Sequence, residues 1–599
     1  MKKLLLGDEA IAQGALDAGL SGVYAYPGTP STEITEYIQN SQLAKDRNVH
    51  RRWATNEKTA MEQALGMSYM GKRALVCMKH VGLNVAADPF VNSAITGANG
   101  GIVILVADDP SMHSSQDEQD TRFYGKFAMI PTFEPSNQQE AYDMMAVAYD
   151  YSEKMHLPVL MRVTTRMAHS RAVVNITETP REQNPLNYEA KASDWVLLPA
   201  FARKRNVVVT GQQAQLEQDA VESPFNKYID GKDHSLGIIT SGIAFNYLNE
   251  CYPDGVPYPV LKVSQYPLPK ELVRRMTAEC DSVLIVEEGQ PFIEEQVRGV
   301  MDGNAVIKGR LTGELPRTGE LSPDELKQAL GLPSGEEYEP CPDLASRPPQ
   351  FCKGCGHRDV YTALNEVLKE YPNARVFGDI GCYTLGATAP LNAVHFTIDM
   401  GASLSVAHGL ELADVPVRNG RPVVGVIGDS TFAHSGITSM LGTIYNAGAG
   451  TLCILDNRTT AMTGCQGNPC NGITLHEQVR GANPLAVERG KRLDIEALCL
   501  ALGADEVETV DAQDYAAVKD ALKRATGAAD KLSVLVFRSP CRLVDLVDDC
   551  RACGKCVRIG CPAIGKDDEG HATIDPAQCI GCAQCIQVCP FGCIAKEGE

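Results

Sequence analysis

The chain has 599 residues, of which 44% are hydrophobic and 22% are charged. That length is too great for one hydrophobic core, so we expect about three to five domains of ordinary globular composition. The formal net charge of −20 argues against nucleic acid and against an anionic membrane surface as main partners. The sequence lacks an apolar stretch of the roughly 18 residues that a membrane span needs. Asp8 and Glu9 interrupt the leucine-rich start too early for a signal peptide, so we expect a cytoplasmic protein.

Short apolar segments alternate with helix-like segments along most of the chain. Fully apolar strands separated by helical spacers are typical of parallel sheets that are covered on both faces. The fold is therefore predicted to be α/β, with several parallel-sheet domains. The predicted strands are residues 22–26, 74–77, 102–106, 158–161, 206–210, 236–240, 282–286, 423–427, 452–455 and 532–537.

Polar, proline-rich segments mark the boundaries between the predicted domains. One lies at residues 180–205 and another at 331–350, and such segments commonly act as linkers. Beyond residue 545 the strand pattern gives way to cysteines. We expect three α/β domains and a small C-terminal domain, at residues 1–180, 200–330, 345–543 and 545–599.

The cysteines after residue 545 form two clusters with a regular spacing. An iron–sulfur cubane needs four thiolates. The two-residue spacings let one tight loop present three of them, and the fourth comes from the other half of the segment, next to a proline. Zinc ribbons are the alternative, but zinc sites use two pairs of cysteines rather than a triplet and a single residue. The motifs read Cys550-x2-Cys553-x2-Cys556-x4-Cys561-Pro562 and Cys579-x2-Cys582-x2-Cys585-x3-Cys589-Pro590.

This spacing predicts a ferredoxin-like module with two [4Fe–4S] clusters that conduct electrons. The x4 spacing before Cys561 adds one residue to the usual pattern and leaves the cluster type unchanged. One cluster is predicted to take Cys550, Cys553, Cys556 and Cys589, and the other Cys579, Cys582, Cys585 and Cys561.

A motif for binding a diphosphate through Mg²⁺ follows two of the predicted strands. Gly428-Asp429-Ser430 ends one strand, and Asn457 and Thr459 follow the next. Mg²⁺ prefers hard oxygen ligands, and the Asp429 carboxylate, the Asn457 side-chain carbonyl and the Thr459 backbone carbonyl can supply them. Gly428 would let the backbone approach a phosphate at the helix N-terminus. For Gly-Asp-Ser alone, a plain strand-to-helix turn is the alternative. The pairing with Asn457, however, resembles the thiamine diphosphate (TPP) signature. That signature usually reads Gly-Asp-Gly, so Ser430 is a departure from it.

A thiamine enzyme also needs a carboxyl group beside the aminopyrimidine ring, where it promotes the tautomer that deprotonates the thiazolium carbon. Glu57 is the candidate, because it opens a predicted helix whose N-cap is Asn56. An acidic residue in the first turn of a helix is common by itself. The segment 79–84 after the next predicted strand favours the catalytic interpretation. His80 in that segment and His434 both flank predicted site loops.

Together these motifs resemble those of the 2-oxoacid:ferredoxin oxidoreductases, and most closely the large subunit of the indolepyruvate ferredoxin oxidoreductases. The resemblance extends over essentially the whole chain. The fusion of a complete thiamine core to a two-cluster ferredoxin indicates the indolepyruvate subfamily. Besides the Mg²⁺ motif and the tail, the resemblance rests on Tyr26-Pro27-Gly28-Thr29-Pro30-Ser31, Asn56-Glu57-Lys58, Cys352-Lys353-Gly354-Cys355-Gly356-His357-Arg358 and Gly378-Asp379-Ile380-Gly381-Cys382.

The resemblance implies transketolase-like domains and roles for individual residues. Glu57 would be the activating acid, and Thr29 would lie near the substrate carboxylate. Gly28 would widen a turn in which the family often has isoleucine. Gly381 and Cys382 would lie beside the cofactor. A third cluster near the thiazolium would be held by Cys352, Cys355, Cys382 and Cys541.

A lone Cys-x2-Cys pair leaves other interpretations open. Cys352 and Cys355 could be structural thiols, and His357 could replace one thiol as a ligand or complete a zinc site. The remaining cysteines are predicted to be small buried hydrophobic residues. These are Cys77, Cys251, Cys280, Cys341, Cys453, Cys465, Cys470, Cys499 and Cys593.

The implied reaction is the oxidative decarboxylation of an aryl 2-oxoacid, with indolepyruvate as the expected substrate, to an aryl-acyl-CoA and CO₂. Electrons would pass singly from the third cluster through the tail clusters to an external ferredoxin. The resemblance implies that a smaller beta subunit contributes to the coenzyme A site, and that two copies of this chain pair within a heterotetramer. The alternatives are an electron-transfer adaptor with a degenerate thiamine scaffold and a non-oxidative thiamine decarboxylase.

Overall fold

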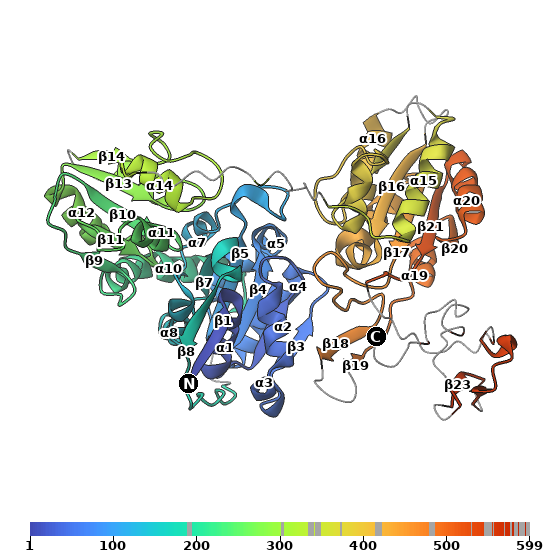
Figure 1. Ribbon diagram of the computed structural model, residues 1–599, viewed down its shortest axis with the longest axis horizontal. Helices are drawn as coiled ribbons and strands as arrows, with labels where there is room; N and C mark the ends of the chain where they lie inside the picture. Colours follow the sequence, from blue (N-terminus) through green and yellow to red (C-terminus); the bar gives the residue numbers. More distant parts are fainter. Residues whose placement is uncertain are drawn as a thin grey trace. The chain divides into compact units, whose positions relative to one another are not determined.

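A computed structural model gives the arrangement of the helices and strands (Figure 1). The chain forms two compact units: Met1–Ser346 with Gly467–Arg492, called here the first unit, and Arg347–Gln466 with Leu493–Glu599, the second unit. Within the described ranges, no helix is both long and apolar enough to cross a membrane. The structure describes residues 1–187, 195–300, 305–333, 341, 349–371, 374–413, 422–478, 485–528, 530–543, 554, 556–567, 570–575, 578–579, 585 and 594.

A seven-stranded sheet forms the centre of the first unit. Its strands pair in parallel, as predicted, except that β12 joins β6 antiparallel at one edge. In the order of the sheet the strands are β12 (Gln265–Tyr266), β6 (Thr132–Phe133), β7 (Val159–Thr164), β5 (Ile102–Asp108), β4 (Ala74–Lys79), β2 (Gly22–Ala25) and β3 (His50–Trp53).

Helices cover both faces of this sheet, which explains why its central strands are apolar throughout. All residues of β5 are buried. Its odd-numbered side chains from 103 to 107 join a core with α1 (Gly7–Asp17) and α8 (Gln138–Met155). Its even-numbered side chains from 102 to 106 join a second core with α4 (Glu57–Tyr69) and α6 (Ala87–Thr96).

A five-stranded sheet makes up the other α/β part of the first unit. Its strands are parallel except for β9. In order they are β14 (Val306–Lys308), β13 (Ser282–Val286), β10 (Gly237–Ser241), β11 (Val260–Val263) and β9 (Lys227–Ile229). The helices around it are α11 (Ala244–Cys251), α12 (Lys270–Glu279), α13 (Phe292–Val300) and α14 (Pro323–Ala329).

The predicted strand at residues 206–210 is wrong, because this segment lies inside helix α10 (Pro199–Val221). A short run of valines cannot be distinguished from part of a buried helix by periodicity alone. Val209 and Leu216 are buried, whereas Val207 is exposed. The valines therefore contribute one buried helical face, not the two faces of a strand in a sheet.

The second unit is built on a five-stranded parallel sheet, as predicted. α15 and α20 pack together on one face, and α16 lies on the other (Figure 1), where α18 packs against it. In order, the strands are β15 (Arg375–Phe377), β16 (Val423–Gly428), β17 (Gly450–Asp456), β21 (Leu532–Arg538) and β20 (Glu506–Asp511). The helices are α15 (Gly356–Leu368), α16 (Ser403–Ala413), α18 (Ile437–Tyr445), α19 (Ile495–Leu502) and α20 (Tyr515–Gly527).

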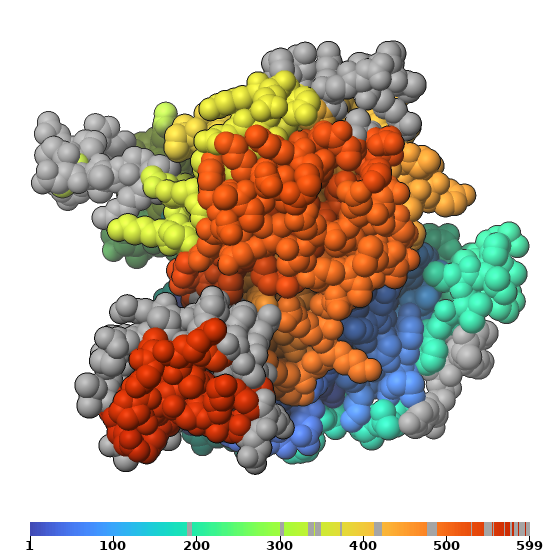
Figure 2. All heavy atoms as spheres, turned by 90° about the vertical axis from the view of Figure 1, so that its right-hand side faces the viewer, coloured from blue at the N-terminus to red at the C-terminus, as the bar shows by residue number. Residues whose placement is uncertain are grey.

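The described residues of the C-terminal segment, which are red in Figure 2, include a small antiparallel hairpin. β22 (Ile564–Lys566) pairs with β23 (Ala572–Ile574). Cys556 and Ile564 are buried in a common core with Ile594. The predicted cluster ligands Cys550, Cys553, Cys582 and Cys589, and also Cys593, lie outside the described residues.

Two buried arginines connect the two sheets of the first unit. Arg162 Nε donates to Asp108 Oδ2 over 2.7 Å at the end of β5, and Arg162 Nη2 donates to the Glu288 carbonyl over 2.9 Å just after β13. Arg122 Nη1 lies 2.9 Å from Glu287 Oε2. Buried charges are tolerated only when they are paired and hydrogen-bonded. These pairs therefore fix the smaller sheet against the larger one.

The buried Glu288 carboxyl should make the stability of the first unit depend on pH. Burial raises the pKa of Glu288 from 4.5 to about 7, although Thr164 Oγ1 donates to its Oε2 over 2.8 Å. The folded state holds a proton that the unfolded chain releases at lower pH. The stability contributed by this group is therefore full below pH 4.5 and is lost as the pH rises through about 7.

We expect Glu288→Gln, which resembles the protonated acid, to reduce this fall in stability with rising pH. The free energy of unfolding would be measured in urea below and above the titration range. Tryptophan fluorescence would monitor the unfolding, because Trp53 and Trp195 both lie in the first unit. A pH dependence identical to that of the parent chain would contradict the prediction.

Candidate active site

Asp429 and Asn457 follow two adjacent parallel strands of the second unit. Gly428, the last residue of β16, pairs with β17, so the residues after both strands leave the sheet at the same edge. Asp429 is 2% exposed and Asn457 9% exposed. A hydrogen bond of 2.8 Å between the hydroxyls of Ser430 and Thr460 joins the two segments. The structure therefore brings the two parts of the predicted motif together.

Hydrogen bonds within the chain hold the loop after β17, and its predicted ligand residues are buried. The Thr459 N–H donates to Asn457 Oδ1 over 3.2 Å, and Thr459 Oγ1 donates to the Gln466 carbonyl over 3.1 Å. Asp429, Asn457 and Thr459 are all buried. A carboxylate, an amide oxygen and a backbone carbonyl are the hard donors that Mg²⁺ shares with phosphate groups. The residues present thus fit a Mg²⁺–diphosphate group.

Gly381 and Gly428 both make room for the ring of Tyr383. A Cβ at position 428 would lie 2.8 Å from Tyr383 Cε1, and one at position 381 would lie 2.4 Å from the same carbon. The Tyr383 hydroxyl donates to Asp379, and burial raises the pKa of this Asp379 carboxyl to about 7. Gly428, which the sequence predicts to lie close to a phosphate, therefore also leaves room for the Tyr383 ring.

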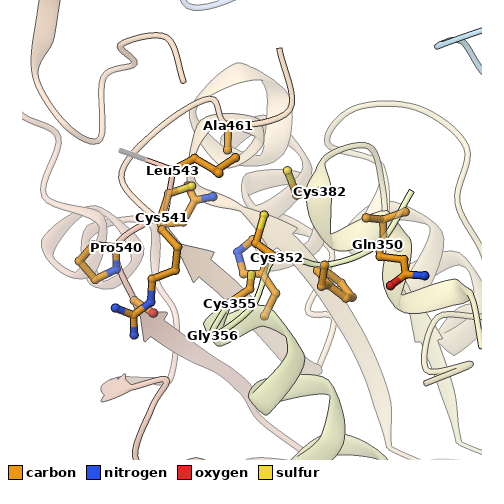
Figure 3. A pocket seen from close by; sticks show the side chains of 15 residues that line it. Gln350, Cys352, Cys355, Gly356, Cys382, Ala461, Pro540, Cys541 and Leu543 are labelled. Carbon is orange, nitrogen blue, oxygen red and sulfur yellow. The ribbon is translucent and has the colours of Figure 1, made fainter. Parts of the chain in front are cut away.

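Four thiols from three separate segments converge on one cavity of the second unit (Figure 3). Cys352 and Cys355 precede α15, Cys382 follows β15, and Cys541 follows β21. Burial, with the neighbouring Cys541, Cys355 and Cys352 thiols, raises the pKa of Cys382 to about 11. Thiols that raise one another's pKa in this way are suited to bind a cation, which would stabilise their thiolates.

Cys465 lies beside Cys541, and its predicted role as a small buried residue is wrong. Its side chain forms a hydrogen bond with Cys541, which, together with burial, raises the pKa of the Cys465 thiol. Its backbone φ of 66° is uncommon outside glycine. Cys465 is only partly buried. The same prediction also fails at Cys341, which is exposed.

His357 lines the same cavity as the four thiols. Burial lowers the pKa of His357 to about 4, so its ring is neutral at neutral pH. Among the described residues, neither ring nitrogen finds a hydrogen-bond partner. Phe351 and Tyr383 contact the ring edge-on. His357 could therefore donate a hydrogen bond to a group in the cavity or serve as a ligand.

The thiol cavity adjoins the predicted diphosphate loop. Asn457 lines the cavity together with the four thiols. The Cys541 N–H donates to the Asn457 carbonyl over 3.1 Å. Groups bound by the thiols and by the loop after β17 would thus be neighbours within the second unit.

In the first unit, Glu57 is held at the start of α4. Asn56 caps this helix, because its side chain accepts from the Thr59 N–H. Glu57 is 5% exposed. Its carboxyl group packs against the backbone of α5 (His80–Val85) at Gly82, where a Cβ would lie 2.7 Å from Glu57 Oε1. Only glycine at position 82 leaves space for the acid.

Lys79 and His80 lie beside Glu57 at the end of β4. Burial lowers the pKa of Lys79, which Asp109, Glu57 and Asp117 partly offset. His80 is fully buried, and its Nε2 is 3.1 Å from the Asp117 carbonyl. His80 Nδ1 has no hydrogen-bond partner in the described part of the chain. An acid, a cation and an imidazole are thus available together for proton transfer.

The predicted turn at Thr29 lies next to Lys79. Lys79 Nζ donates to the Ser114 carbonyl over 2.9 Å, and Ser114 Oγ donates to the Thr29 carbonyl over 3.3 Å. A Cβ at Gly28 would lie 3.2 Å from the Lys79 side chain. By contrast, His434 belongs to the second unit, in a π-helical turn after Asp429, where its Nδ1 is 2.8 Å from Ser435 Oγ.

Comparisons with known proteins agree with this arrangement. Three family models match the chain: pyruvate flavodoxin/ferredoxin oxidoreductase, thiamine diphosphate-binding, at residues 13–229; thiamine pyrophosphate enzyme, C-terminal TPP binding domain, at 379–537; and 4Fe-4S dicluster domain at 542–592. The chain is 38% identical over 621 residues to indolepyruvate oxidoreductase subunit IorA of Archaeoglobus fulgidus, covering 98% of this chain and 96% of the relative. The chain belongs to this family.

A second relative is the same subunit of Pyrococcus horikoshii, 38% identical over 651 residues, covering 100% of this chain and 98% of the relative. A solved structure of 2-oxoglutarate:ferredoxin oxidoreductase from Magnetococcus marinus, with 2-oxoglutarate, coenzyme A and succinyl-CoA bound, is 14% identical with a TM-score of 0.45 and covers 55% of this chain and 65% of that chain. The protein is thus a 2-oxoacid:ferredoxin oxidoreductase subunit that oxidises 2-oxoacids with TPP and carries a [4Fe–4S] dicluster domain.

Family membership confirms the resemblance, the thiamine domains and the ferredoxin-like module. The ligands of the third cluster and the roles of individual residues stay predictions. Sequence reasoning missed Lys79, Gly82 and Cys465 as parts of the two sites. Lys79 and Gly82 had a signal, since both stand in the segment 79–84 that the sequence had singled out. Cys465 becomes informative only when its neighbour Cys541 is known.

Gly82→Ala should impair catalysis by moving Glu57. The new methyl group would lie 2.7 Å from Glu57 Oε1, so we expect turnover to fall by about a hundredfold, a magnitude typical of a lost acid–base group. Gly66→Ala is the control, because Gly66 lies on the neighbouring helix with nothing within 4 Å of its added Cβ. Anaerobic turnover assays with a dye acceptor would compare them, and equal activity of both variants would refute the proposed packing role.

Proposed function

We propose that this chain catalyses the TPP-dependent oxidative decarboxylation of aryl 2-oxoacids, with indolepyruvate as the preferred substrate. The observation that carries the proposal is the shared wall of the thiol cavity and the diphosphate loop, where the Cys541 N–H donates to the Asn457 carbonyl. A donor of electrons and a first acceptor would be neighbours there. The relatives' name, indolepyruvate oxidoreductase, supports indolepyruvate as the substrate. Gly28 also supports an aryl substrate, because glycine would widen the turn in which the family often has isoleucine.

TPP, when bound, supplies the nucleophilic carbon and the electron sink for decarboxylation. Asp429, Asn457 and Thr459 would hold Mg²⁺ on its diphosphate. Glu57 would exchange a proton with the aminopyrimidine ring. Thr29 and the Lys79 ammonium would orient the substrate carboxylate. The burial of Glu57 shields its carboxyl group from water, which strengthens its charge interactions.

The two electrons released per 2-oxoacid would leave one at a time. Their first acceptor would be a [4Fe–4S] cluster on Cys352, Cys355, Cys382 and Cys541, followed by the tail clusters and an external ferredoxin. Coenzyme A would take the acyl group, and CO₂ would leave. The family's subunit naming indicates a multi-subunit enzyme. We propose that a smaller beta subunit completes the coenzyme A site, and that two copies of this chain pair in the assembly.

An anaerobic assay tests this function. The chain and its partner subunit would receive indolepyruvate, phenylpyruvate, pyruvate or 2-oxoglutarate, with coenzyme A and a viologen dye. We expect dye reduction and aryl-acyl-CoA with indolepyruvate foremost. Aldehyde without dye reduction would identify a non-oxidative decarboxylase. A chain that purifies with clusters but never binds TPP would be an electron-transfer adaptor.

Asp429→Asn should abolish Mg²⁺-dependent TPP binding and leave the iron content unchanged. The substitution keeps the side-chain shape and removes the charge that balances a buried diphosphate–metal group. The amount of TPP that stays with the protein after gel filtration in Mg²⁺ would measure binding. Iron analysis of the same sample is the internal control. Full retention of TPP would remove Asp429 from the metal site.

Cys541→Ser should remove the third cluster, whereas Cys465→Ser should retain it. With three cubanes we expect about twelve iron atoms per chain, and about eight without the third cluster. Cys465 is the matched control, because its thiol is hydrogen-bonded to Cys541 but does not line the cavity. Iron analysis with electron paramagnetic resonance would count the clusters. Loss of iron in Cys465→Ser but not in Cys541→Ser would reverse the assignment.

A further inference from the structure

Three metal-ligating side chains, none of them assigned above to the candidate active site, converge in the first unit. Asp8 lies in the first turn of α1, Glu33 in the first turn of α2 (Thr32–Asn40), and His169 ends α9 (Thr165–His169). One ligand atom from each lies within 4.8 Å of the other two, and His169 Nε2 is 3.5 Å from Glu33 Oε1. Ligands bound about 2.1 Å from one ion lie roughly 3 to 4 Å apart, so a small contraction would close this group around a cation.

Asp8 lacks the partner that a buried carboxyl group requires. Its side chain is 0% exposed, and neither carboxyl oxygen has a hydrogen-bond partner in the described part of the chain. Glu33 Oε2 is likewise unpartnered there. An unpaired buried carboxylate is costly, and burial with the nearby Glu33 and Glu9 raises the pKa of Asp8. A cation at this point would supply the missing partner for both acids.

We propose that Asp8, Glu33 and His169 bind a divalent transition-metal cation of the Zn²⁺ class. An imidazole nitrogen with two carboxylates is a ligand set typical of Zn²⁺, whereas Mg²⁺ and Ca²⁺ favour oxygen ligands alone. Asp8 forms the closed base of the site, and the half-exposed Glu33 and His169 form its rim. Water can reach the rim and take a fourth position.

Such an ion would connect three elements of the first unit. It would tie α2 to α1 and α9. Glu33 comes four residues after Thr29, so the ion would also anchor the turn that we propose holds the substrate carboxylate. The metal site itself does not depend on that proposed function, because its ligands are separate from Glu57, Lys79 and Thr29.

Metal analysis of the full chain tests the site. Anaerobically purified protein would be dialysed to equilibrium against Zn²⁺ and assayed for zinc and iron per chain. We expect Asp8→Asn and His169→Gln each to bind about one zinc fewer than the parent chain, at equal iron content. Glu36→Gln is the matched control, because Glu36 lies on the same helix outside the group. Zn²⁺ should raise the melting temperature of the parent and of Glu36→Gln, but of neither ligand variant.

Equal zinc content in all four proteins, or no bound zinc at all, would overturn the proposal and identify Asp8 as a protonated buried acid. Asparagine has the shape of aspartate, so Asp8→Asn is expected to fold. His169 is half-exposed and gives a second test that does not touch the core. Equal iron content in every variant shows that zinc has not entered cluster sites, and it separates this test from any failure of the proposed reaction.

Discussion

The ion pairs of Arg122 and Arg162 are the interaction on which the first unit depends. Both guanidinium groups are buried between the seven-stranded and five-stranded sheets. Removing one member of such a group leaves an uncompensated buried charge, which costs about 3–5 kcal/mol. The cost arises because the partner charges cannot reach water. The same property makes the interface specific, since only the native docking of the two sheets brings Glu287 and the Glu288 carbonyl to these arginines.

This network also positions the catalytic side of the first unit. Asp108 ends β5 and accepts from Arg162 and from the Thr121 N–H. The loop between Asp108 and Thr121 carries Ser114 and Asp117, which contact Lys79 and His80. A loop anchored at both ends by one carboxylate has little freedom. The buried charges thus support side chains that do not themselves touch Arg162.

Local motifs could be predicted from the sequence because covalent spacing nearly determines their geometry. Asp429 and Asn457 meet because parallel strands end at one edge, and the capped helix at Glu57 follows from Asn56. Features that depend on packing between distant segments could not be predicted. Cys465 looks like any small residue until Cys541 is seen beside it, and the valines of α10 fit a strand until their burial is known.

The loop after β17 links metal binding to electron transfer in one short stretch of chain. Asn457 at its start bonds to Cys541 through its carbonyl and offers its side chain to Mg²⁺, while Cys465 near its end bonds to the Cys541 thiol. A hydrogen bond to a cluster sulfur shifts the cluster's reduction potential. If Cys541 is a cluster ligand, as we propose, the loop that offers Asn457 to Mg²⁺ also provides the hydrogen bond to that ligand. The cofactor and its first electron acceptor would then be supported by the same loop, so a change in this loop would affect both.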